Sequence, residues 1–213
     1  MLSLFTVMFS IFSLLIYSSK SYAEETKCYF PDIPSFFEGK TLPNGQPADL
    51  SFADYRTLNP KGAALLLNCA KTLYKNADLS QFNDASRKRL NRTMDTTWQL
   101  HNTAATAQKD GYIALGGNSD IGGANDLGTM IIDSHKKLVA IGLLFNTRDR
   151  IDENEKNNYF YANFLFIYDS SDFVDKKFIA INEMDSILNI INENTYGTFV
   201  FGNKYFLGSS LRL

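Results

Sequence analysis

The sequence predicts an α+β domain in which an N-terminal arm and helices pack on an antiparallel β-sheet. After residue 60, apolar side chains recur every three or four positions, as expected of amphipathic helices. From residue 112 onward, short apolar and aromatic runs are separated by turn residues, which is typical of strands. Helices followed by strands in separate runs favour the α+β class over alternating units around a parallel sheet.

The N-terminal residues 1–23 are typical of a secretory signal peptide. Residues 1–17 contain no charge and are dominated by apolar side chains, and Ser21-Tyr22-Ala23 places small residues where a signal peptidase cuts. We therefore expect cleavage after Ala23 and a periplasmic or secreted protein. No Lys or Arg precedes the apolar run, so an uncleaved anchor is the alternative, although the run is shorter than the roughly 20 residues of a membrane span.

Cleavage would leave residues 24–213, which is 213 − 23 = 190 residues and the size of a single domain. The chain has 21 basic and 23 acidic residues, and only Lys20 would be lost with the signal. The remaining chain is mildly acidic and has no basic stripe to neutralise phosphates, so nucleic acid is not an expected partner. We expect no stable membrane insertion after cleavage, and no feature indicates an oligomeric state.

The two cysteines, Cys28 and Cys69, both follow the signal segment. In an exported protein an even pair is most simply a disulfide, which here would attach the arm to a helix. The alternative is a redox or metal role, but the chain has no Cys-x-x-Cys motif and only two histidines.

The first structural segment, residues 24–60, is predicted to be an irregular arm. It contains all five prolines of the chain and the turn Pro43-Asn44-Gly45. Its aromatic residues are expected to dock on the body of the domain; they are Tyr29, Phe30, Phe36 and Phe37.

Two helices are predicted after the arm. The first begins at Pro60, a residue suited to a first helical turn, and continues through Tyr74. The second has apolar residues at helical spacing, and its basic cluster Arg87-Lys88-Arg89 is expected to be solvated; the apolar residues are Phe82, Ala85, Leu90, Met94 and Trp98. Residues 93–108 fit either the end of this helix or a strand that turns at Lys109-Asp110-Gly111.

The remaining elements are predicted mainly as strands. A β-hairpin is expected where the turn 134–137 joins two apolar runs. A second hairpin is expected around Gly202-Asn203, and the aromatic strand before it has poor alternation, so both of its faces are expected to be covered. The predicted strands are 112–115, 129–133, 138–145, 159–168, 178–181, 196–201 and 205–207, with a helix at 183–192.

Several classes of enzyme lack their sequence signals. The chain has no Gly-x-Ser-x-Gly motif, no recognisable motif surrounds His101 or His135, and His135 is expected to be solvent-exposed in a turn. The His and Cys spacing of a zinc site is absent. Paired carboxylates of a glycoside hydrolase are set in space rather than in sequence, and no pair stands out. We therefore expect no cofactor, no metal and no catalytic activity.

The most unusual stretch is the glycine-rich segment 116–128. It lacks the strand-then-helix setting of a dinucleotide-binding loop. Its Asn and Asp residues could coordinate calcium, but their spacing does not follow the twelve-residue calcium loop and no Glu closes it. Two further interpretations remain open. The segment is either a protruding recognition loop, since glycine permits unusual backbone shapes, or a flexible connector.

The order of elements over about residues 58–201 resembles the periplasmic inhibitors of vertebrate lysozyme of the Ivy type. The likeness is carried by Tyr-Ile-Ala-Leu-Gly-Gly at 112–117, by the loop, and by the apolar runs at 128–133 and 138–144. In that family the loop, cross-linked by two cysteines flanking Lys-Pro-His-Asp, plugs the lysozyme active site. The corresponding stretch here, about residues 117–122, has neither cysteine and no histidine, and Asp120 is its matching carboxylate.

The resemblance implies a periplasmic protein that inhibits a cell-wall hydrolase, or an immunity protein that blocks a toxin delivered by a competitor. The polar contacts would come from the loop: Asn118, Ser119, Asp120, Asn125 and Asp126. An acidic loop would steer a basic partner; its carboxylates are Asp149, Asp152, Glu153 and Glu155. The alternatives are an envelope enzyme with carboxylate chemistry and an accessory envelope protein.

Overall fold

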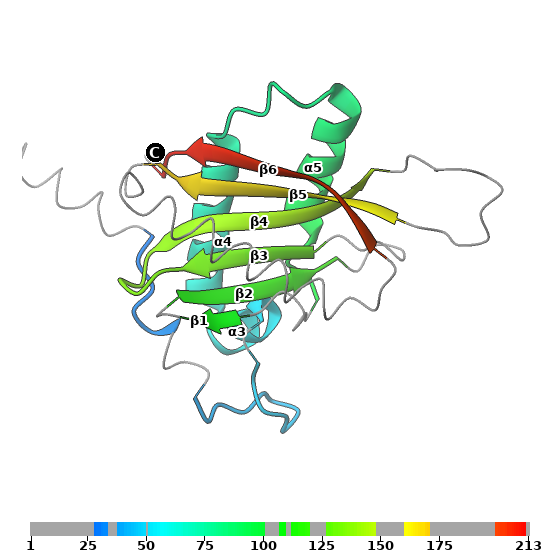
Figure 1. Ribbon diagram of the computed structural model, residues 1–213. Helices are drawn as coiled ribbons and strands as arrows, with labels where there is room; N and C mark the ends of the chain where they lie inside the picture. The colour runs from blue at the N-terminus through cyan, green and yellow to red at the C-terminus, as the bar shows by residue number, and fades with distance from the viewer. Residues whose placement is uncertain are drawn as a thin grey trace, which may run out of the picture.

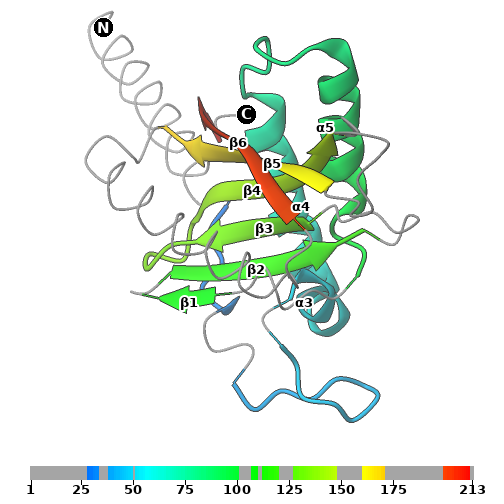
Figure 2. The same ribbon diagram turned by 45° about the vertical axis from the view of Figure 1, so that its right-hand side comes forward.

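The computed structural model describes residues 28–33, 38–49, 51–100, 107–109, 112–119, 127–147, 160–170 and 199–211. Within these ranges three helices cover one face of a six-stranded sheet (Figure 1, Figure 2). This arrangement confirms the predicted α+β class. The predicted signal segment, the acidic loop, the strand 178–181 and the helix 183–192 all lie outside the described residues, as does His101.

The helices are α3 (Phe52–Leu58), α4 (Pro60–Lys75) and α5 (Asp84–Thr96). The start of α4 is as predicted: Pro60 occupies its first turn, and the Asn59 side chain accepts a hydrogen bond from the Gly62 amide at 3.0 Å. Helix α3 lies inside the segment that was expected to be irregular. It has only seven residues, and it is held by the Ser51 cap and by two fully buried aromatic side chains, Phe52 and Tyr55.

The sheet has the order β1-β2-β3-β4-β5-β6, so each strand pairs with its neighbour in sequence. The first five strands are antiparallel, as predicted, but β5 and β6 are parallel, and the sheet is therefore mixed. The strands are β1 (Ala107–Lys109), β2 (Tyr112–Asn118), β3 (Leu127–Ile132), β4 (Leu138–Thr147), β5 (Phe160–Asp169) and β6 (Phe199–Ser209). Strand β1 settles the ambiguity of residues 93–108, because α5 ends before a strand begins.

The predicted closing hairpin around Gly202-Asn203 is wrong, because both residues lie inside the continuous strand β6. Ala162 pairs with Phe201, but Phe164 pairs with Lys204, so two residues of β6 stand opposite Asn163 alone. This is a β-bulge, and the Asn163 side-chain oxygen accepts a hydrogen bond from the Asn203 amide at 3.0 Å. Gly-Asn suits a bulge as well as a tight turn, and pairing with β5 decides between them.

The core has two parts, one on each face of the sheet. The helix-covered face packs Leu115, Met130 and Ile141 against apolar residues of α3, α4 and α5. The opposite face carries a second buried cluster that includes Ile131, Phe164 and Phe166. Strand β5 contributes to both clusters, which confirms that both of its faces are covered.

The N-terminal arm is attached to the domain at three points. Cys28 forms a disulfide with Cys69 of α4, with their Cα atoms 5.9 Å apart, as predicted. The Phe30 amide donates to the Lys136 carbonyl oxygen at 2.6 Å, and the Leu138 amide donates to the Cys28 carbonyl oxygen at 3.1 Å. Among the arm's aromatic residues, Phe30 is buried as expected, but Tyr29 is 44% exposed, and Phe36 and Phe37 lie outside the described residues.

The β3–β4 hairpin forms as predicted. The Asp133 amide donates to the Lys137 carbonyl oxygen at 2.9 Å, and Lys136 closes the turn with a φ of 67°. The His135 side chain is exposed, with Nδ1 3.5 Å from Asp133 Oδ2. This confirms that His135 is a solvated turn residue.

Candidate functional site at the base of the glycine-rich loop

The glycine-rich segment is shorter as a loop than the sequence indicated. Strand β2 continues to Asn118 and β3 begins at Leu127, and these two residues pair. Only residues 119–126 therefore connect the strands. Of the predicted contact residues, Asn118 ends β2 and Ser119 follows it, whereas Asp120, Asn125 and Asp126 lie outside the described residues. We call the ends of the two strands, residues 116–118 and 127–128, the loop stem.

Two glycines of the loop stem make room for the segment that leaves α5. Gly117 and Gly128 are register partners on neighbouring strands. A Cβ atom on Gly117 would lie 2.6 Å from the Thr97 carbonyl oxygen and 2.9 Å from Trp98 Cε3. A Cβ atom on Gly128 would collide with Thr97 Cγ2 and lie 2.7 Å from Trp98 Cη2. These glycines are therefore required for close packing and not only for loop shape.

Trp98 is held firmly where it crosses these glycines. Its Nε1 donates to the Met94 carbonyl oxygen at 2.9 Å, and its ring meets that of Phe52 edge to face at 5.9 Å. The side chain is only 2% exposed. The Trp98 indole thus packs between the loop stem and residues of α3 and α5.

Backbone pairing fixes the stem on its outer side. The Leu100 amide donates to the Asn118 carbonyl oxygen at 2.9 Å, and the Asn118 amide donates to the Leu100 carbonyl oxygen at 3.1 Å. Arg56 of α3 donates to the carbonyl oxygens of Trp98 at 3.4 Å and Gln99 at 2.9 Å. The Leu100 side chain is 44% exposed, so an apolar group lies at the surface directly beside the stem.

Of the two described members of the predicted contact set, Asn118 belongs to the loop stem and Ser119 follows it directly. Ser119 is only 6% exposed, and Asn118 Oδ1 is buried without a hydrogen-bond partner in the described part of the chain. Thr129 Oγ1, on β3, is a second buried oxygen of this kind. Sequence reasoning did not find the residues that support the loop stem, which are Trp98, Leu100 and Arg56. The signal that could have found the first is that Trp98 is the chain's single tryptophan and precedes a glycine-rich segment.

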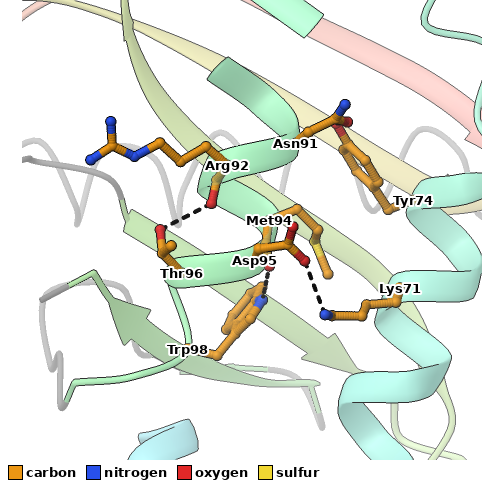
Figure 3. A network of polar contacts seen from close by, with 8 residues as sticks. All are labelled: Lys71, Tyr74, Asn91, Arg92, Met94, Asp95, Thr96 and Trp98. Carbon is orange, nitrogen blue, oxygen red and sulfur yellow. Dashed lines mark hydrogen bonds and ion pairs between the residues drawn. The ribbon is translucent and has the colours of Figure 1, made fainter. Parts of the chain in front are cut away.

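A second polar cluster joins α4 to α5 (Figure 3). The Lys71 ammonium lies 3.0 Å from Asp95 Oδ1, and the Tyr74 hydroxyl donates to Asn91 Oδ1 at 2.8 Å. Burial, and then the negative charge of Asp95, raise the pKa of Tyr74 to about 12. The cluster holds the helices together, and its groups contain no nucleophile paired with a base.

The described residues contain no group of three or more His, Cys, Asp or Glu side chains that could hold a metal ion. They also contain no helix long and apolar enough to cross a membrane. The calcium alternative for residues 116–128 falls mostly on residues outside these ranges.

Comparison with known proteins adds no family. No family model matches the chain, and no curated protein is significantly similar to it.

Proposed function

We propose that this chain is an exported binding protein that inhibits an enzyme by inserting the connection between β2 and β3 into its active site. The target would be a lysozyme-like cell-wall hydrolase or a delivered antibacterial toxin, and in the second case the chain would be an immunity protein. The observation that carries the proposal is the loop stem. It is packed against Trp98 and paired to Leu100, and Arg56 of α3 in turn holds the Trp98 carbonyl oxygen.

A rigid stem matters because inhibition by a loop depends on preorganisation. A loop whose base is fixed loses less conformational entropy on binding, so more of its contact energy appears as affinity. The disulfide between the arm and α4 agrees with export. Of the predicted set, Asp120, Asn125 and Asp126 would make the main polar contacts, because the Asn118 backbone is paired with Leu100 and Ser119 is buried.

Two further features suit such a partner. The exposed Leu100 side chain would supply an apolar contact beside the loop. Asp149, Asp152, Glu153 and Glu155 would raise the association rate with a basic enzyme.

The test is capture of the target from envelope and culture extracts. Processed protein is compared with a variant carrying Asp120→Ala, Asn125→Ala and Asp126→Ala. A matched control, Glu38→Ala with Asn44→Ala and Asp78→Ala, removes the same charge and the same amide from exposed positions elsewhere. The captured enzyme is then assayed for inhibition.

We expect the control to capture and inhibit a hydrolase or toxin, and the loop variant to lose both properties while it keeps its circular dichroism spectrum. Equal capture by both variants would place the binding surface elsewhere. Turnover of peptidoglycan by the purified protein would favour the envelope enzyme instead.

A further inference from the structure

The balanced net charge of the chain conceals a strong local imbalance. Helix α4 carries three lysines and no acidic residue, and α5 carries four basic and two acidic residues. The two helices together hold seven cations and two anions, a surplus of five, whereas the whole chain has a net charge of −2. Helices α4 and α5 therefore carry a local surplus of positive charge, although the sequence has no basic stripe.

This charge faces away from the sheet. The two helices lie side by side over one sheet face (Figure 1, Figure 2), and their apolar sides are buried against it. Lys61 and Lys75 of α4 and Lys88 and Arg92 of α5 are all exposed, and we call them the outward cations. Lys88 and Arg92 are four residues apart and share one helix side, and Arg92 extends away from α4 (Figure 3).

The acidic residues of the layer are already engaged. Asp95 forms an ion pair with Lys71, and Asp84 forms one with Arg87. None of the outward cations has an acidic partner among the described residues. Within the described part of the chain, these four cations give the outer face of the two helices a positive potential.

The spacing of the outward cations indicates the kind of partner. Lys61 and Lys75 are 14 residues apart on α4, which corresponds to about 21 Å along the helix axis. A hydrogen bond or ion pair joins atoms only about 3 Å apart, so a single phosphate cannot contact both lysines across that distance. A partner that engages both ends of this face must therefore be extended and anionic.

The residues between the cations favour a lipid surface over a nucleic acid. The exposed side chains near these cations are short or polar, and neither helix has a fully exposed aromatic ring on which bases could stack; they are Ala64, Asn68, Lys71, Ala85, Asn91 and Asp95. The one ring close to them, Tyr74, is half-buried and donates to Asn91. Leu65 of α4 is 38% exposed and could enter the headgroup region. We propose that the outer face of α4 and α5 docks on an anionic phospholipid bilayer, by surface adsorption without insertion.

The experiment measures binding of the processed protein, purified from cells that express the full chain, to vesicles. Phosphatidylcholine vesicles with and without phosphatidylglycerol are compared at low and physiological salt. Each basic residue near such a surface strengthens binding roughly fivefold, so Lys88→Gln with Arg92→Gln should weaken it on the order of 25-fold. The matched control, Lys40→Gln with Lys204→Gln, removes the same charge from exposed positions outside the helical layer.

We expect binding only to the anionic vesicles, weakened by salt and by the helix variant but little changed in the control. Three results would overturn the proposal: equal binding to neutral vesicles, equal loss in both variants, or binding to soluble polyphosphate or polyglutamate with none to vesicles. The outcome of the vesicle assay does not depend on the proposed inhibitory function, because the enzyme-capture assay tests the connection between β2 and β3 and the vesicle assay tests the outer face of α4 and α5.

Discussion

A methyl group added at Gly128 provides the sharpest test of how the loop stem is held. In Gly128→Ala the new Cβ would meet Thr97 Cγ2 and would lie 2.7 Å from Trp98 Cη2 and 3.1 Å from Cζ3. None of these atoms is the far end of a flexible chain, because Trp98 is anchored to the Met94 carbonyl oxygen. The strain can be relieved only by rotating the buried Thr97 side chain, by moving the indole or by separating the strands.

The expected cost follows from two opposing effects. Overpacking a dense core costs about 1–3 kcal/mol, and replacing glycine by alanine returns roughly 0.4–1 kcal/mol by restricting the unfolded chain. We expect a net loss of about 0.5–2 kcal/mol, which for a chain of this size lowers the melting temperature by roughly 1–8 °C. Gly208→Ala on β6 is the control, since its nearest atom would be Tyr168 Oη at 3.4 Å, an ordinary contact.

Thermal and urea unfolding of the two variants would measure this difference. The second arm adds Thr97→Ser to Gly128→Ala, which removes the colliding Cγ2 atom and should recover part of the loss as a positive coupling energy. If Gly128→Ala is as stable as Gly208→Ala, Trp98 is not a tight wedge and the argument for a rigid stem fails.

Three further predictions concern the supports of the domain. Replacing both Cys28 and Cys69 by alanine removes a disulfide between residues 41 positions apart, and it should lower the free energy of unfolding by about 3–4 kcal/mol. A variant as stable to chemical denaturation as the oxidised protein would contradict this. Since the pKa of Tyr74 is raised to about 12 from an unfolded value near 10, its contribution to stability is full below pH 10 and is lost as pH rises from 10 to 12. Tyr74→Phe should therefore make the free energy of unfolding depend less on pH between pH 10 and 12. An unchanged pH dependence would contradict the raised pKa of Tyr74. Arg56→Ala, which removes two hydrogen bonds to carbonyl oxygens, should cost about 1 kcal/mol and weaken partner capture, whereas Lys71→Ala, at an exposed ion pair, should cost under about 1 kcal/mol.

Local chemistry alone was sufficient for several elements. Pro60 after a capping Asn59 set the start of α4, and helical spacing set its buried face. The turn at 134–137 between two apolar runs set the β3–β4 hairpin. The two cysteines predicted their own pairing, because only one disulfide is possible. Each of these features depends on neighbours in sequence or on a choice with a single outcome.

Tertiary structure decided what local chemistry left ambiguous. Gly202 and Asn203 suit a turn and a bulge equally, and only the long-range pairing of β6 with β5 made them a bulge in a parallel strand. Gly117 and Gly128 looked like loop residues, but the arrival of Trp98 from α5 made them packing positions in strands. The sequence alone thus determined α4, the β3–β4 hairpin and the covalent link. Which partner each glycine faces depended on residues distant in sequence, because packing and strand pairing act through space rather than along the chain.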